Sequence, residues 1–239
     1  MKMVQAGMLA LLLLCFFGFL SCNARINGPL NADGTAVLSV NMSLEPRTIA
    51  LIQRLTAAAG APKAGAFILD GAAISASMSK APGIASVSFK NTAPAAMEGP
   101  LRISKINDFL APGSNEGFIT FTQERSGGRC KINISRENGP DLLSFLSPEI
   151  EDYLNALMAP IATGEELSKT GYLGEVTTVY NKALSDEIAG SRIRASIDFP
   201  GSVTSVKGGT FSGRRASFDV PLLDLLVLET PVVFEVEWK

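Results

Sequence analysis

Histidine is absent from this chain, and cysteine occurs only three times, at Cys15, Cys22 and Cys130. Without histidine there can be no Ser-His-Asp or Cys-His catalytic arrangement, no HExxH zinc site and no histidine-based pH switch. Basic residues are not in excess either, because 21 Lys and Arg face 23 Asp and Glu. This balance gives no basic footprint for nucleic acid. We therefore expect a protein that is not an enzyme, with no catalytic residues, no metal, no cofactor and no nucleic-acid partner.

Long apolar runs are also few, and the longest lies at the start of the chain. Lys2 is followed by an apolar run over residues 8–20. A charged start, an apolar stretch of about a dozen residues and a small residue at the cut are typical of a secretory signal. The run is shorter than the roughly 20 residues that a membrane-spanning helix needs. We expect residues 1–21 to be removed.

The end of this run carries the sequence Phe19-Leu20-Ser21-Cys22. It resembles the lipobox of bacterial lipoproteins, with Phe19 in place of the usual Leu. The resemblance implies that a diacylglycerol joins the Cys22 sulfur and that cleavage leaves Cys22 as the mature N-terminus. It also implies a cell-envelope protein, anchored to a membrane through this lipid on the periplasmic or extracytoplasmic face. The alternative is ordinary signal cleavage after Ala24, with Cys22 and Ala24 as the small residues of the cleavage site.

The remaining chain predicts one domain. Residues 22–34 form a short polar lead with no long linker, and residues 35–239 form a single α+β domain. Apolar and polar residues alternate over 38–44, 118–123, 129–136, 192–199, 203–207, 214–220 and 232–238, which predicts strands. Apolar residues at helical spacing predict helices from Pro46 to about residue 57, over 148–158, and from about Thr163 or Thr170 to Ala189. We expect an antiparallel sheet packed against two or three helices.

Two stretches interrupt this pattern. Residues 57–100 are rich in Ala, Gly, Ser and Pro, which indicates either tight packing or a mobile insertion; we favour an insertion at the edge of the domain, with Asp70 capping a short helix. Residues 222–228 form an apolar run that is either a buried crossover, the interpretation we favour, or an exposed patch facing a membrane or a partner.

Cys130 is the single cysteine left once Cys15 is removed and Cys22 is acylated. It alternates with Arg129 and Lys131 on a strand whose hairpin turn we place at Ser126-Gly127-Gly128. Because those cations point to the opposite face of the strand, we interpret Cys130 as a small buried hydrophobe rather than a nucleophile.

Several short motifs are typical of catalysis but lack the context for it. Ser77-Met-Ser-Lys80, Tyr153-Leu-Asn155 and Lys169-Thr-Gly171 follow the order of the penicillin-recognising serine hydrolases. However, Lys169-Thr-Gly171 lies in a predicted helix, whereas that family carries the motif on a strand.

The glycines at 208–213 have P-loop spacing but precede Arg214-Arg215 between strands, which favours a turn. The acidic residues Glu149, Glu151, Asp152, Glu165 and Glu166 surround two predicted helix starts, where they favour the helix dipole more simply than a cation site.

The helix–strand–Phe199-Pro200-Gly201–strand–Gly-rich turn–strand order resembles the C-terminal half of the soluble domain of LppM-like lipoproteins. The Asp33-Gly34 turn followed by an alternating strand is similar as well. This resemblance covers some twenty residues after Cys22 and the last seventy, and it implies an α+β envelope domain with suspected affinity for lipids or glycolipids.

The favoured function is therefore a non-catalytic envelope lipoprotein with a scaffold or interaction role, whose partner is an envelope protein or lipid. The alternative is a lipid or hydrophobic-ligand binder with a pocket between helices and sheet, lined by Leu154, Leu157, Leu173, Val176 and Tyr180. A remote alternative is a penicillin-recognising hydrolase with a Ser77–Lys80–Lys169 site.

Overall fold

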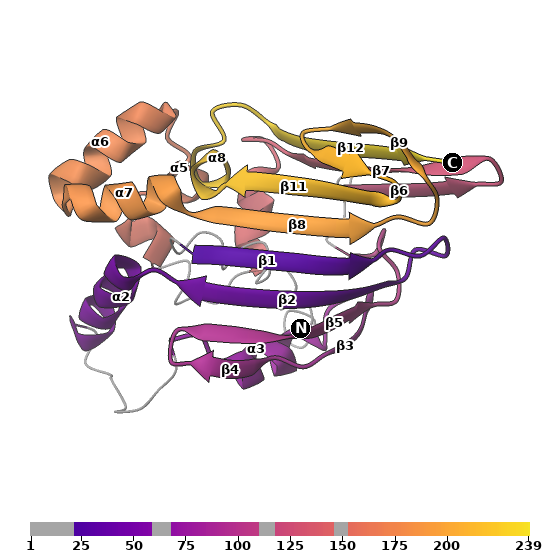
Figure 1. Ribbon diagram of the computed structural model, residues 1–239. Coiled ribbons are helices and arrows are strands. Elements are labelled where there is room, and N and C mark those ends of the chain that lie inside the picture. Colours follow the sequence, from indigo (N-terminus) through magenta and orange to yellow (C-terminus); the bar gives the residue numbers. More distant parts are fainter. Residues whose placement is uncertain (1–21, 59–67, 110–117, 146–152) are drawn as a thin grey trace, which may run out of the picture.

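The computed structural model describes residues 22–58, 68–109, 118–145 and 153–239, so the predicted leader lies outside the described residues. Two sheets and several helices form the described part of the chain (Figure 1). The fold class is thus α+β. The prediction of one antiparallel sheet is wrong, because there are two sheets and the larger one is mixed.

The larger sheet has eight strands, in the order β10-β11-β8-β1-β2-β5-β3, with β4 also paired to β5. Its strands are β1 (Cys22–Pro29), β2 (Ala36–Leu44), β3 (Ile84–Val87), β4 (Lys90–Ala93), β5 (Ala96–Ile103), β8 (Arg192–Asp198), β10 (Thr210–Ser212) and β11 (Arg215–Pro221). β1 and β8 run parallel, with Asn23 opposite Arg192, while the other pairs are antiparallel.

The smaller sheet is antiparallel, in the order β6-β7-β12-β9. Its strands are β6 (Ile119–Glu124), β7 (Gly127–Ile134), β9 (Val203–Lys207) and β12 (Val232–Trp238). A short turn containing Gly208 joins β9 to β10 and so links the two sheets, and Gly208 there has a positive φ of 79°. The predicted turn over residues 208–213 is confirmed only at its ends, because Thr210–Ser212 between them form β10.

The first strand is the main feature that the sequence prediction missed. Residues 22–34 were expected to form a polar lead, but β1 lies in the interior of the larger sheet, between β2 and β8. Ala24 is fully buried and Ile26 is half-buried, and they alternate with the polar Asn23, Arg25 and Asn27. This short period-two pattern is interrupted by Gly28 and Pro29, which made it look like a loop.

The small-residue segment is not an insertion in its described part. β5 lies inside the larger sheet, beside β2. A Cβ on Gly99 would overlap the carbonyl oxygen of Ser88 and would lie 2.9 Å from Cα of Phe89. Glycine is therefore required where the chain between β3 and β4 runs alongside β5, with the Ser88 amide donating to the Pro100 carbonyl oxygen at 3.1 Å, so the small residues permit close packing. Residues 59–67 of this segment lie outside the described part.

The described helices include α2 (Pro46–Ala58), α3 (Gly71–Met78), the 3-10 helix η2 (Gly139–Phe145), α5 (Pro160–Thr163), α6 (Lys169–Val179), α7 (Lys182–Gly190) and α8 (Leu222–Val227). The predictions of α2 and α3 are confirmed. The predicted cap of α3, Asp70, accepts hydrogen bonds from the amides of Ala72 and Ala73 at 3.0 Å. Residues 153–156 are helical as expected, while 148–152 lie outside the described part.

The single predicted helix that ends at Ala189 is in fact two. α6 ends at Val179, and Asn181 begins α7 by accepting a hydrogen bond from the Leu184 amide at 2.9 Å. Thr177, Thr178 and Val179 are β-branched, which lowers helix propensity, and Asn181 is a favourable N-cap. These two signals together explain the break.

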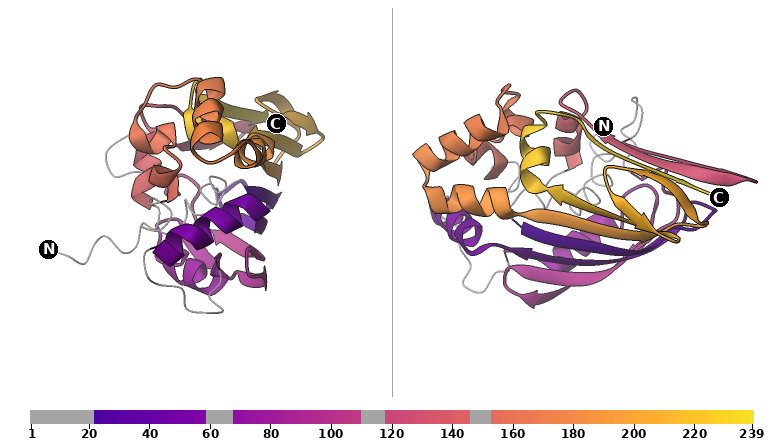
Figure 2. Two further views of the ribbon diagram at one scale, coloured as in Figure 1. Left: turned by 90° about the vertical axis from the view of Figure 1, so that its left-hand side faces the viewer. Right: turned by 45° about the horizontal axis from the view of Figure 1, so that its top comes forward.

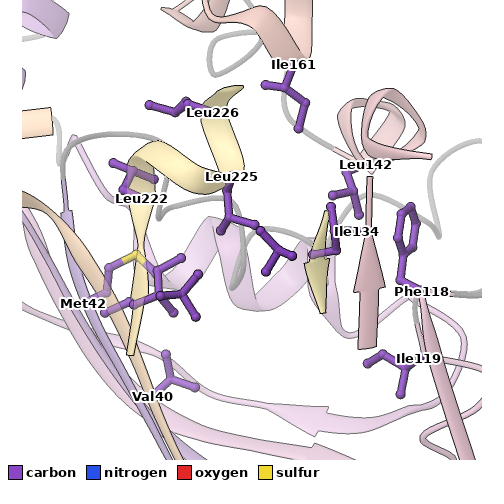
Figure 3. Close-up of a cluster of buried hydrophobic side chains, with 14 of the residues drawn as sticks. Val40, Met42, Phe118, Ile119, Ile134, Leu142, Ile161, Leu222, Leu225 and Leu226 are labelled. Atoms are coloured by element: carbon purple, nitrogen blue, oxygen red, sulfur yellow. The ribbon is translucent and has the colours of Figure 1, made fainter. Parts of the chain in front are cut away.

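The core fills the space between the two sheets (Figure 3). Val40 and Met42 reach into it from β2, and α8 closes one end with Leu222, Leu225 and Leu226. All three leucines are at most 5% exposed. Residues 222–228 are therefore a buried crossover, as favoured from the sequence, and not an exposed patch.

Gly127 and Gly128 of the β6–β7 hairpin lie in β7 and not in the turn, where they were predicted. The turn is Arg125-Ser126, while Gly127 and Gly128 pair with Glu124 and Gln123 in the ladder. A Cβ on Gly128 would overlap the indole ring of Trp238, and one on Gly127 would overlap the Trp238 carbonyl oxygen. The two glycines thus make room for the last strand.

Candidate functional site

The predicted attachment residue, Cys22, is the first residue of β1. It lies opposite Leu44, the last residue of β2, and the next residue, Asn23, lies opposite both Ser43 and Arg192. β2 leads directly into α2, and α7 leads directly into β8. The start of β1 therefore lies at the end of the sheet where α2, α6 and α7 gather (Figure 1).

Polar contacts hold this end together. The Asn23 side chain donates to Glu45 Oε1 at 2.6 Å. The Leu222 amide donates to the Ser191 carbonyl oxygen at 3.0 Å, which ties α8 to the junction of α7 and β8. These bonds link the first residues of β1 to the loop before α2, and the end of α7 to α8.

A carboxylate from α7 caps α2. Glu187 accepts from the Arg47 amide with both oxygens, each at 2.9 Å, and from the Thr48 amide at 3.2 Å. The first amides of a helix have no partner within it and carry the positive end of its dipole. α2 has no acidic residue in its own first turn, so Glu187 supplies the missing acceptor. No pattern in the sequence predicts this contact, which joins residues 140 positions apart.

The predicted ligand wall lies in the core. Leu154, Leu157 and Val176 are 0% exposed, and Leu173 and Tyr180 pack against them partly buried. Tyr180 donates its hydroxyl to the Ala156 carbonyl oxygen. All five residues thus belong to the apolar core of the described chain or pack against it, and their role as a ligand wall stays a prediction.

Tyr172 carries a polar atom into the same cluster. Its side chain is 0% exposed, and its hydroxyl has no hydrogen-bond partner among the residues that the structure describes. Burial, with neighbouring Tyr153, Tyr180 and Glu175 adding to it, raises the pKa of Tyr172 far above its usual value. A buried hydroxyl without a partner costs about 1–3 kcal/mol. The sequence analysis did not identify this residue.

A surface cleft of about 220 Å³ lies between η2, α5 and α8. Arg136 lines it, and its guanidinium already donates to the Leu167 carbonyl oxygen at 2.7 Å and to that of Val227 at 3.4 Å. Glu137, Glu165 and Glu166 also line the cleft. Because the one cation is engaged by backbone and the rest of the charge is negative, the cleft has no free group to bind an anion.

The acidic cluster is only partly within the described chain. Glu165 and Glu166 are exposed in the loop between α5 and α6, before the cap Ser168, so they lie outside the first helical turn where they were predicted. Residues 149, 151 and 152 lie outside the described part. Among the described residues, no group of three Cys, Asp or Glu side chains could hold a metal ion.

The serine-hydrolase motif falls on unsuitable elements. Lys169-Thr-Gly171 begins α6 instead of lying on a strand, and the Lys169 ammonium donates to Asp224 Oδ1 at 2.9 Å. This contact raises the pKa of Lys169. Ser77 lies on α3, which packs against β3 and β4. α6, which carries Lys169, lies instead beside α7 at the end of the sheet where β8 begins (Figures 1 and 2).

Cys130 occupies the position predicted for it. It is a free, buried thiol on β7, and burial raises its pKa to about 12. A thiol with that pKa is protonated and unreactive at neutral pH.

Within the ranges that the structure describes, no helix combines the length and apolarity needed to cross a bilayer.

Comparison with known proteins gives little further information. No family model matches the chain, and no curated protein matches it. Among solved structures, the chain is similar to the folded domain of Mycobacterium tuberculosis LppM, determined by NMR. That similarity has a TM-score of 0.40 and 9% sequence identity, and it covers 92% of this chain and 90% of the other. It is a distant likeness that carries no inference about function, and it does not bear on the lipobox.

Proposed function

We propose that this protein is a bacterial envelope lipoprotein, anchored through a lipid on the Cys22 sulfur, whose non-catalytic domain serves as a scaffold or contacts other envelope components. One observation carries the proposal. Cys22, the residue at which the lipobox-like sequence places the mature N-terminus, is already part of the larger sheet, where it pairs with Leu44 of β2. A cut before Cys22 removes the leader and leaves the whole of β1 in the mature chain.

The same strand argues against the alternative cut after Ala24. That cut would remove Cys22, Asn23 and Ala24, which pair with β2 over its last three residues. It would also remove the fully buried Ala24 side chain and the hydrogen bond from Asn23 to Glu45. A mature chain that begins at Arg25 would lose part of an interior strand, whereas one that begins at Cys22 keeps it.

The interior supports a scaffold role over a carrier role. The residues that would line a ligand pocket fill the core themselves, and three of them are 0% exposed. The unpaired Tyr172 hydroxyl is the one observation that favours a bound hydrophobic ligand, since a polar group of a ligand could satisfy it.

The test uses the full-length protein expressed in a bacterial host. We expect mass spectrometry of the membrane fraction to show a chain that begins at Cys22 and carries the mass of a diacylglycerol with or without an amide-linked acyl chain. Cys22→Ala should abolish that mass and move the domain to the aqueous fraction, while Cys15→Ala, in the leader, should change neither. A mature chain that begins at Arg25 without lipid would overturn the proposal.

Native mass spectrometry of the same protein, released from detergent, tests the carrier alternative. A lipid-sized adduct that persists on Cys22→Ala protein and disappears on denaturation would favour the carrier function. Protein without an adduct would favour the scaffold.

A further inference from the structure

The position of Cys22 in the fold determines which end of the domain can face the membrane. This step rests on the proposed function. No residues separate the lipid-bearing position from β1, so the anchor cannot act as a flexible tether. The bilayer surface must then lie at the end of the sheet where β1 begins.

The helices extend past that point. Arg192, the first residue of β8, is level with Asn23, and α7 lies before it, along the line of β8 (Figures 1 and 2). α7 has nine residues, which corresponds to about 13 Å at 1.5 Å per residue. The corner between α6 and α7 is therefore farther out than Cys22 by about this distance, and Figure 1 shows it at the far left.

The outermost corner presents an apolar side chain. Val179, the last residue of α6, is 56% exposed, the most of the three exposed large hydrophobic residues in the described chain. The preceding Thr177 and Thr178 donate their hydroxyls to the Leu173 and Gly174 carbonyl oxygens at 2.8 and 2.9 Å. Their polar groups are thus already bonded within the helix and would not need water.

The charges at this end suit an anionic surface. α2 carries the exposed Arg47 and Arg54 and contains no acidic residue. Three of the four acids at this end have partners: Glu45 accepts from Asn23, Glu187 caps α2 and Asp186 pairs with Lys182 at 2.6 Å, which leaves Glu175 on α6 as the acid that opposes the two arginines. Basic residues near an anionic bilayer are attracted to its headgroups.

We propose that α2 and the α6–α7 corner, here called the helical end, form the face that rests on a lipid bilayer. The corner then enters the bilayer beyond the level of Cys22, with Val179 among the first acyl carbons, and Arg47 and Arg54 lie among anionic headgroups. The acyl chains supply the affinity, while the helical end fixes the orientation. The opposite end, with the β6–β7 turn at Arg125-Ser126, points away from the membrane (Figure 1).

The test compares two labelled positions on the mature, lipidated protein, which is obtained by expressing the full-length chain. Val179→Cys and Ser126→Cys are each labelled with an environment-sensitive fluorophore; both sites are exposed, and the buried Cys130 does not compete. The proteins are reconstituted into vesicles of phosphatidylethanolamine and phosphatidylglycerol that contain a headgroup nitroxide. We expect several-fold stronger quenching and a blue-shifted emission at position 179. Equal quenching at both positions, or stronger quenching at 126, would overturn the orientation.

A second variant separates charge from simple proximity. Arg47→Glu with Arg54→Glu should weaken the quenching at position 179 in anionic vesicles and leave it unchanged in vesicles of phosphatidylcholine. If the double substitution left the quenching in anionic vesicles unchanged, the proposed role of the arginines would be overturned. The mass of the reconstituted protein is measured in parallel. If Cys22 carries lipid but position 179 is not quenched more strongly than position 126, only the proposed orientation is rejected. If the chain carries no lipid, the proposed function and the orientation are both rejected.

Discussion

The carboxylate of Glu187 on α7 accepts two hydrogen bonds from the backbone amide of Arg47, at the start of α2. This contact joins two helices that are distant in sequence, next to the strand that begins at Cys22. It replaces the local cap that α2 lacks, so the stability of α2 depends on α7.

Replacement of this carboxylate should therefore destabilise the domain. We expect Glu187→Gln to lower the free energy of unfolding by about 1 kcal/mol and Glu187→Ala by about 2 kcal/mol, because a charged acceptor at a helix N-terminus is weakened or lost. Urea unfolding of residues 22–239 with Cys22→Ser, followed by circular dichroism, measures the change. Asp186→Asn is the matched control on the same helix, since it removes only an exposed pair with Lys182. An equal loss in both variants would contradict the capping role.

Gly128 should tolerate no side chain. A Cβ there would overlap the Trp238 ring and lie 2.6 Å from the Thr122 carbonyl oxygen, so we expect Gly128→Ala to cost about 2–3 kcal/mol. Gly174→Ala provides the comparison, because no atom lies within 4 Å of its Cβ and alanine favours a helix over glycine by about 1 kcal/mol. Fluorescence of Trp238, the single tryptophan, reports both unfolding transitions. A stable Gly128→Ala protein would show that β12 does not pack against this hairpin.

Tyr172, on α6, and Tyr180, at the C-terminal end of α6, should respond to loss of the hydroxyl in opposite directions. Tyr172→Phe removes a buried hydroxyl that has no partner, so we expect stability to be unchanged or raised by about 1 kcal/mol. Tyr180→Phe removes a bonded hydroxyl and should lower stability by about 1 kcal/mol. Thermal unfolding of the two variants in parallel checks this difference. If Tyr172→Phe were the more damaging of the two, the hydroxyl would have to have a partner in solution.

Alkaline pH should act through the same residue. Burial raises the pKa of Tyr172 in the folded protein above its unfolded value of about 10. Because the unfolded chain then loses the proton first, this contribution to stability is complete below about pH 10 and is lost as the pH rises further. Denaturation midpoints measured from pH 8 to pH 11 should fall for the parent chain and fall less steeply for Tyr172→Phe.

The Cys130 thiol should react only after unfolding. With a pKa raised to about 12 and a buried side chain, it offers neither thiolate nor access near pH 8. In a chain with Cys22→Ser, a disulfide reagent should leave the native protein unmodified and label one thiol in denaturant. Ser126→Cys, on the exposed turn, should add a second thiol that reacts at once. Rapid labelling of native Cys130 would mean that β7 opens readily.

Sequence patterns predicted the elements whose apolar residues alternate over six or more positions, such as β2 and β12. They also predicted the burial of Cys130 and of residues 222–228. They could not predict the parallel pairing of β1 with β8, because a strand pattern does not specify its neighbours. The apolar spacing placed the five residues of the expected pocket in the core, and such spacing cannot distinguish a lined cavity from a filled core. The Glu187 cap and the buried Tyr172 hydroxyl depend on tertiary contacts, which periodicity does not encode.

The place of β1 in the larger sheet has a consequence for how the chain folds. β1 needs β8 as a neighbour, about 170 residues later, and β7 needs β12, which ends one residue before the C-terminus. Contacts between such distant segments make folding slow, because the chain must close long loops before it gains them. The domain can therefore complete neither sheet until nearly all of it has been synthesised. If the chain crosses a membrane as proposed, this delay keeps it unfolded, so that it can pass through a narrow channel. β1, the strand next to the anchor, gains its neighbour β8 only when the last third of the chain has emerged.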